Sequence, residues 1–155
     1  MKLDHIALRV KDRYVTASFY IEFLECLIED EFKINFDDGT QADCLSLKNP
    51  DNEQRIFISD GDENSIVGKW VKAHSGVGGV HHIAYAVDDV YKVMSEWEKK
   101  GIKFSSSPIH CENGLVQVFT TEQENGLVYE LIQTSGEHFC KESVKKLMES
   151  SQNDS

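Results

Sequence analysis

Two stretches of the chain alternate apolar and polar residues in the same way. In DHIALRVKD, Ile6, Leu8 and Val10 fall on one side of a predicted strand and His5 falls on the other. The stretch HHIAYAVDD repeats this pattern 77 residues later, with His82 in the place of His5. A repeat of nearly half the chain indicates a duplicated unit. We expect each apolar side to pack on a helix and both histidines to lie on the opposite face.

A helix and three more strands are predicted after each of these strands. Val15, Phe19 and Phe23 recur at helical spacing after Asp12, a candidate N-cap, and the second helix follows Asp88 or Asp89. Turn residues separate the later strands. These are expected at 28–36, 41–47 and 54–59 in the first copy and at 102–106, 114–120 and 126–133 in the second. The βαβββ order, found twice, predicts an α+β fold whose two modules form a half-open barrel.

A chain of 155 residues suits one domain with a real core. We expect that domain over residues 1–138, with a short helix at 65–74 in the linker and a capping helix after the last strand. The expected boundaries are module one at 1–62, a linker at 63–79, module two at 80–136, a C-terminal capping helix at 139–150 and a disordered tail at 151–155.

Composition narrows the class of function. The formal net charge of −11 disfavours nucleic acid and anionic membranes as partners. The four cysteines form no CxxC pair, and no signal peptide or long apolar run is present. We therefore expect a cytoplasmic protein with reduced thiols. A ligand or redox role for Cys111 and Cys140 is the alternative.

His5, His82 and Glu130 are the candidate metal ligands. If the two modules pair, both histidines face one concavity, and Glu130 lies within the apolar strand VYELIQ, where burial of a carboxylate is costly without a partner. Taken singly, such residues are more often ordinary core or surface groups. The repeat favours a shared site. Histidine and carboxylate suit Fe, Zn, Ni, Co or Mn, and three such ligands with open positions are typical of non-haem Fe(II) oxygenases.

Arg55 is a second candidate site residue. Superposing the fourth strands of the two modules places Arg55 opposite Glu130. Arginine cannot bind a metal, so we expect three protein ligands. Arg55 is then either an exposed edge residue or a clamp for a substrate carboxylate, which its fork of donors suits.

The openings DHIALRV and GGVHHIAYAVDDV, with VYELIQ closing the second copy, resemble the vicinal oxygen chelate superfamily over nearly the whole chain. That superfamily includes glyoxalase I, methylmalonyl-CoA epimerase, extradiol dioxygenases, 4-hydroxyphenylpyruvate dioxygenase and antibiotic-resistance proteins. The resemblance therefore implies a small-molecule substrate and a homodimer, but it does not fix the reaction.

Within the superfamily, LVQVFT, LVYELIQ and the closing helix are similar to the catalytic half of 4-hydroxyphenylpyruvate dioxygenase. This similarity implies that His5, His82 and Glu130 hold Fe(II), that Gln117 lines the substrate pocket and that Phe139 shuts the cavity. The implied function is an Fe(II) dioxygenase that uses O₂ and an α-keto acid or vicinal diol. Co, Ni, Zn and Mn are the alternative metals, and Gln117 is otherwise an ordinary strand residue.

Methylmalonyl-CoA epimerase is the competing resemblance, because it has a similar GG-x-HHI opening and a similar length. That family takes a fourth ligand from the position that Arg55 holds in the superposed strands, so the loss of this ligand favours the oxygenase. The alternatives are an isomerase or lyase of the epimerase or glyoxalase type, and a resistance-type binding protein in which the three ligands would be dispensable.

Overall fold

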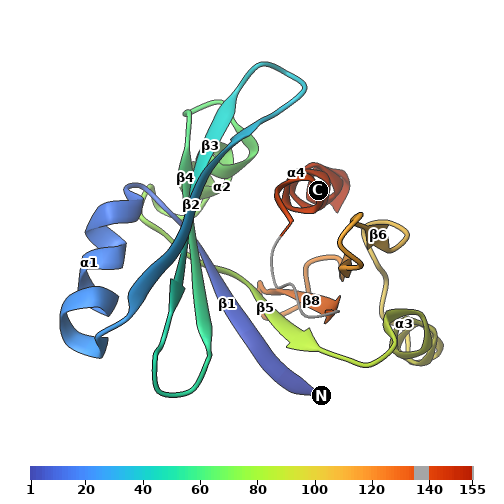
Figure 1. The fold of residues 1–155 in the computed structure, drawn as a ribbon. Coiled ribbons are helices and arrows are strands. Elements are labelled where there is room, and N and C mark those ends of the chain that lie inside the picture. The colour runs from blue at the N-terminus through green and yellow to red at the C-terminus, as the bar shows by residue number, and fades with distance from the viewer. Residues whose placement is uncertain (135–139, 155) are drawn as a thin grey trace. The chain divides into compact units, whose positions relative to one another are not determined.

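The computed structural model describes residues 1–134 and 140–154. The elements of this range are β1 (Lys2–Val10), α1 (Arg13–Leu24), β2 (Leu27–Asn35), β3 (Gln41–Lys48), β4 (Arg55–Gly61), α2 (Ile66–Ala73), β5 (Gly78–Ala86), α3 (Val90–Lys99), β6 (Ile109–His110), β7 (Val116–Phe119), β8 (Val128–Gln133), α4 (Lys141–Ser150) and a 3₁₀ turn (Ser151–Asp154). The strands are hydrogen-bonded in the order β2-β3-β4-β1-β5-β8-β7-β6. The α+β class and the repeated βαβββ order are confirmed (Figure 1).

The chain divides into two compact units. The first unit is His5–His81 and holds β2, β3, β4, α1 and α2 with most of β1. The second unit is Met1–Asp4 with His82–Ser155 and holds β6, β7, β8, α3 and α4 with the larger part of β5. Over the described residues, every helix is too short or too polar to span a membrane.

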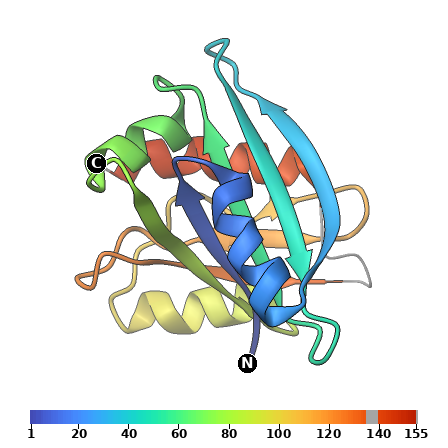
Figure 2. The ribbon, with the colours of Figure 1, turned by 90° about the vertical axis from the view of Figure 1, so that its left-hand side faces the viewer.

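In the first unit, β4 pairs in parallel with β1 and antiparallel with β3, which pairs antiparallel with β2. Leu8 and Val10 point to one side of β1 and are buried with Ala17 of α1, the helix that lies across these strands in Figure 2. Because side chains alternate, His5 and Arg9 point to the other side. We call that side the histidine face of the first unit.

Helix α1 exposes the residues whose spacing predicted it. Val15 is 71% exposed and Phe19 and Phe23 are more than half exposed, whereas Ala17 is buried and Tyr20 packs against the core. The predicted helix is confirmed, but because it is apolar on more than one side, the residues whose spacing predicted it are not those that pack on the core.

Aspartates begin two of the helices, as the sequence predicts. The Asp12 side chain accepts hydrogen bonds from the amides of Tyr14 (2.9 Å) and Val15 (3.1 Å). The Asp89 side chain accepts one from the amide of Lys92 at 3.1 Å, so Asp89 rather than Asp88 is the second N-cap. Each carboxylate satisfies amides that have no partner within the helix.

We expect Asp89→Ala to lower the free energy of unfolding by about 1 kcal/mol, because it removes the acceptor for the first turn of α3. Urea denaturation measures this loss. Asp88→Ala is the matched control, since Asp88 is exposed and does not cap the helix. Equal losses in the two variants would contradict the assignment of the cap.

In the second unit, β8 pairs in parallel with β5 and antiparallel with β7, which pairs antiparallel with β6. Helix α3 packs on one side of these strands, where Val90 contacts Leu131. Helix α4 packs on the other side, where Leu147 contacts Phe119. Figure 1 shows the two helices on opposite sides of β8. The α4 side also carries His82, and we call it the histidine face of the second unit.

The strand predicted at 102–106 is wrong. Phe104 forms only an isolated bridge with Thr120, and the two-residue strand β6 comes later in the chain. The hydroxyl of Ser105 donates to the carbonyl of Thr120 at 3.1 Å, and Pro108 has no amide hydrogen to contribute to a ladder. The serine-rich segment therefore makes single hydrogen bonds to the end of β7 in place of a regular strand.

The end of the chain also differs in part from expectation. Helix α4 begins at Lys141, within the predicted range, and Phe139 lies outside the described residues. The predicted tail contains a 3₁₀ turn, and the hydroxyl of Ser151 donates to the carbonyl of Met148 at 2.7 Å. This serine extends the helix by a turn where polar composition suggested disorder.

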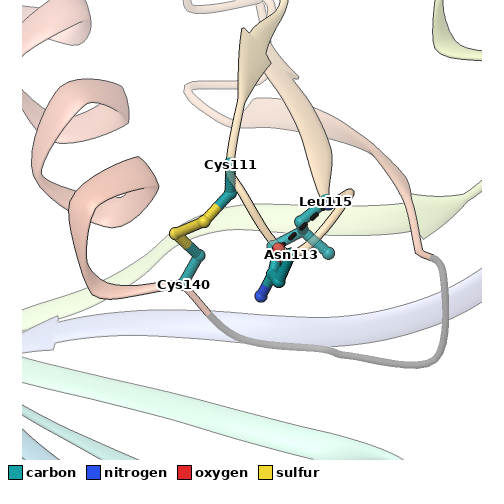
Figure 3. Close-up of a disulfide and its surroundings, with 4 residues drawn as sticks. All are labelled: Cys111, Asn113, Leu115 and Cys140. Carbon is teal, nitrogen blue, oxygen red and sulfur yellow. Dashed lines mark hydrogen bonds between the residues drawn. A yellow bond between two sulfur atoms is a disulfide. The ribbon is translucent and has the colours of Figure 1, made fainter.

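Cys111 and Cys140 form a disulfide, which corrects the expectation of four reduced thiols (Figure 3). Cys111 follows β6 and Cys140 directly precedes α4, so the bond ties the closing helix to the sheet of the second unit. Cysteine spacing alone does not give connectivity, which depends on the fold. Cys26 and Cys44 are free and buried, and burial raises the pKa of the Cys44 thiol far above its usual range.

Candidate metal centre

Glu130 is the most deeply buried polar side chain on the histidine face of the second unit. It lies on β8 and is 1% exposed. Its neighbours on the same face are His82 of β5 and Gln117 of β7, which are also buried. A carboxylate withdrawn from water in this way needs hydrogen-bond donors, a positive charge or a metal ion.

Nitrogen atoms approach both oxygens of the Glu130 carboxylate. His82 Nε2 lies 3.4 Å from Oε1, and Gln117 Nε2 donates to Oε2 at 3.3 Å. Gln117 Oε1 is buried without a hydrogen-bond partner among the described residues. An imidazole beside a carboxylate is a donor set that binds zinc and other divalent transition metals. The residues present therefore fit such an ion.

An aromatic ring links the closing helix to His82. The ring of Phe119 lies 4.7 Å from that of His82, and Leu147 of α4 packs against Phe119. Helix α4 therefore limits the movement of the imidazole through one intervening side chain. Phe119 was not predicted as a site residue, although it lies two residues from Gln117, a spacing that places both on one side of β7.

His5 occupies, on the first unit's histidine face, the position that His82 occupies in the second. It begins the paired part of β1 with β4, and its ring lies 6.2 Å from that of Phe57. Phe57 in turn lies 5.7 Å from the ring of Phe32 on β2. The ring of Phe57 therefore lies between the histidine and that of Phe32 in a chain of aromatic contacts.

The predicted equivalence of Arg55 and Glu130 is wrong. In the second unit, Glu130 pairs with the residue two positions after His82. In the first unit, the residue paired two positions after His5 is Phe57. Phe57 therefore corresponds to Glu130, because strand register decides which residues are equivalent. A phenyl ring cannot bind a divalent metal. The first unit therefore supplies no ligand at this position, and three protein ligands are still expected.

Arg55 forms a forked ion pair with Glu29 of β2. Its Nε and Nη2 atoms lie 2.7 Å and 2.9 Å from the two carboxylate oxygens. This is the geometry that guanidinium groups prefer with carboxylates. The role of Arg55 as a clamp for a substrate carboxylate stays a prediction, and its fork already binds a carboxylate of the chain.

The other histidines of the described residues have partners elsewhere in the structure. The ring of His74 stacks on Trp70 at 3.7 Å and that of His81 meets Trp70 edge-on at 5.5 Å. His110 Nε2 lies 2.6 Å from the hydroxyl of Tyr91. Phe139 is outside the described residues. Its role in shutting a cavity stays a prediction.

Solved structures share the fold of this chain. A mutant of 4-hydroxymandelate synthase from Streptomyces coelicolor matches with a TM-score of 0.86 at 22% identity, over 99% of this chain and 55% of the synthase chain. Methylmalonyl-CoA epimerase from Mycobacterium tuberculosis matches with a TM-score of 0.70 at 21% identity, over 86% of this chain and 88% of the epimerase chain. A Streptomyces coelicolor methylmalonyl-CoA epimerase in complex with 2-nitronate-propionyl-CoA matches with a TM-score of 0.64 at 23% identity. The match covers 88% of this chain and 99% of that epimerase chain. The chain thus spans about half the length of the synthase.

No curated protein sequence matches the chain. A family model for the glyoxalase/bleomycin resistance protein/dioxygenase superfamily matches residues 4–119, which include His5 and His82. This match covers most of the repeated pattern and confirms the resemblance seen in the sequence. The chain belongs to the glyoxalase/bleomycin resistance protein/dioxygenase superfamily.

Proposed function

We propose that His5, His82 and Glu130 hold one divalent metal ion. Support comes from the buried His82–Glu130 pair and from the repeat, which gives His5 the equivalent position in the first unit. The three residues are a donor set of the kind that can hold a metal ion. Two histidines and one carboxylate are typical of non-haem Fe(II) oxygenases. We therefore propose Fe(II), with Co, Ni, Zn and Mn as alternatives.

The neighbouring residues orient and shield this centre. Gln117 holds one oxygen of Glu130 and so limits rotation of the carboxylate. Phe119 and Leu147 exclude water from the side of His82 that they cover. Gln117 Oε1 has no protein partner among the described residues and is available to accept a hydrogen bond from a substrate. A bound metal would supply a common point of contact for the substrate and O₂.

We propose that the reaction is the dioxygenation of an α-keto acid or a vicinal diol. The observation that carries this proposal is the residue at the position equivalent to Glu130, which is Phe57. A first unit that offers only His5 leaves three protein ligands, and hence open positions for a chelating substrate and O₂. The similarity to a 4-hydroxymandelate synthase over 99% of this chain supports the same reaction class.

Epimerase, isomerase or lyase chemistry is the second candidate. It is supported by the shared fold with the M. tuberculosis methylmalonyl-CoA epimerase, over 86% of this chain. Such a reaction needs a base that moves a proton while a metal polarises a carbonyl. The carboxylate of Glu29 is a candidate base, but Arg55 holds both of its oxygens. This pairing disfavours the second candidate.

The test is metal analysis of protein purified without oxygen, followed by O₂-uptake assays with α-keto acids and catechols. Iron together with substrate-dependent uptake is the expected result. Cobalt, nickel or zinc, with solvent deuterium exchanged into an acyl-CoA and no O₂ uptake, would replace the dioxygenase by the epimerase. Small-molecule binding that survives His82→Ala would indicate a binding protein of the resistance type. A homodimer and a cytoplasmic location stay predictions.

Gln117→Leu tests whether Gln117 orients the Glu130 carboxylate for metal binding. Because Gln117 positions Glu130, we expect metal affinity to fall by about 10-fold to 100-fold, as for other groups that orient metal ligands. Metal-free stability should fall by about 1–3 kcal/mol, because the buried Glu130 carboxylate loses a hydrogen-bond donor. A competitive chelator titration and urea denaturation measure the two effects. Unchanged metal affinity would contradict the proposed role.

A further inference from the structure

Arg9 is a buried cation on the histidine face of the first unit. It lies on the same side of β1 as His5, and its side chain and backbone together are 4% exposed. Its paired residue on β4 is Ser59, which is also buried. A guanidinium remains charged at any physiological pH and is rarely buried without a counter-charge.

No ion pair or side-chain hydrogen bond of Arg9 is found among the described residues. Arg13 and Arg55, in contrast, are paired with the carboxylates of Asp60 and Glu29. Burial lowers the pKa of Arg9 to about 10, and no carboxylate of the described residues contributes to its electrostatic environment. Arg9 is therefore protonated and lacks an acidic partner.

The aromatic neighbour of Arg9 offsets only part of the cost of burial. The guanidinium carbon lies 6.0 Å from the centre of the Trp70 ring, at the outer limit of a cation–π contact. The ring of Trp70 itself contacts those of His74 and His81. The tryptophan supplies one rigid wall beside the cation. No nitrogen of Arg9 is among the fully buried atoms without a partner in the described residues, so its donors can accommodate a ligand.

We propose that Arg9 binds an oxyanion of a ligand, a carboxylate or a phosphate, at the end of the histidine face remote from His5. Four residues of strand separate their Cα atoms by about 13 Å. A ligand held near His5 would therefore reach Arg9 with an anionic group at its far end. This last step rests on the proposed function, and it narrows the substrate to a molecule with a metal-binding end and a second anionic end.

This proposal assigns the binding of an anionic group to Arg9, whereas the sequence suggested Arg55. Arg55 was the candidate because of its position, but its fork binds Glu29. Arg9 offers the same planar fork without an internal carboxylate. The net charge of −11 disfavours general attraction of anions to the surface, so anion binding by this chain would indicate a specific site.

The test uses the full chain as purified, titrated with malonate or inorganic phosphate at constant ionic strength in chloride. The fluorescence of Trp70 is the readout, in a Trp97→Phe background, because the anion would alter the charge beside the Trp70 ring. We expect saturable binding of at least one of the two anions. Arg9→Met should weaken it at least tenfold, and Arg13→Met, which removes an arginine paired with Asp60, should leave it unchanged.

Saturable binding that is equal in Arg9→Met and the parent protein would overturn the proposal, and so would the failure of both anions to bind the parent protein. If Arg9→Met does not fold, Arg9→Lys is used instead, because lysine keeps the charge but lacks the planar fork of donors. We then expect weaker binding in Arg9→Lys, and unchanged binding would overturn the proposal. The titration is repeated with a chelator, so that loss of the metal and loss of the anion site are measured separately.

Discussion

Glu130→Gln is expected to reduce both the metal content and the substrate-dependent O₂ uptake of the protein by more than about 100-fold. A neutral amide keeps the size of the side chain but removes the anionic ligand, and loss of a ligand should cost more than loss of a group that only orients one. Metal analysis and an oxygen electrode measure the two quantities on the same preparation.

The same substitution should leave the metal-free protein at least as stable as the parent. Glu130 is 1% exposed, and an amide is less costly to bury than a carboxylate. Urea denaturation in the presence of a chelator tests this. Glu124→Gln, at an exposed position of the same unit, is the matched control and should change neither metal content nor stability. A full complement of metal in Glu130→Gln would exclude Glu130 as a ligand.

Glu130→Gln should lower metal binding without lowering the stability of the metal-free protein. This combination distinguishes a functional residue from a structural one. Removal of a buried group that serves only the fold lowers the stability of the protein. A buried group retained for binding destabilises the protein as long as its ligand is not bound. Glu130 and Arg9 share this property, one as a buried carboxylate and one as a buried cation without an acidic partner. In both cases the proposed ligand, a metal ion for Glu130 and an oxyanion for Arg9, has the opposite charge and so lowers the free-energy cost of burying the side chain.

The sequence was sufficient for the order of the elements because the chain repeats itself. The alternation around His5 and His82 indicated which side of each strand packs on a helix, and Leu8 with Val10 does so in the structure. The alternation within VYELIQ placed Glu130 in an apolar strand, and Glu130 is buried there. These features depend on local periodicity, which a single sequence contains.

Features that depend on register and on distant contacts could not be obtained in this way. The equivalence of Phe57 with Glu130 depends on how β4 aligns with β1, which two strands of similar pattern do not reveal. The pairing of Arg55 with Glu29 joins residues on strands that are not adjacent in the sheet. The face of helix α1 that packs on the strands is not evident from the sequence, because apolar residues lie on several of its sides.

Reduction of the disulfide is expected to lower the free energy of unfolding by about 2–4 kcal/mol. The bond joins residues separated by 29 positions, and closing a loop of this size restricts the unfolded chain by roughly that amount. In the folded chain it holds the start of α4, whose Leu147 packs on Phe119 beside His82. A cytoplasmic location would expose the bond to reducing conditions. Urea denaturation with and without a thiol reductant measures the change.

The variants that test this bond should respond to the reductant in different ways. A double substitution, Cys111→Ser with Cys140→Ser, should have lower stability than the parent in either buffer and no response to the reductant. Cys26→Ala removes a free cysteine and should keep the full response. If reduced and oxidised parent protein unfold at the same urea concentration, the bond does not contribute to stability. If the double variant also kept parental metal affinity, the closing helix would hold Phe119 against His82 through its apolar contacts alone.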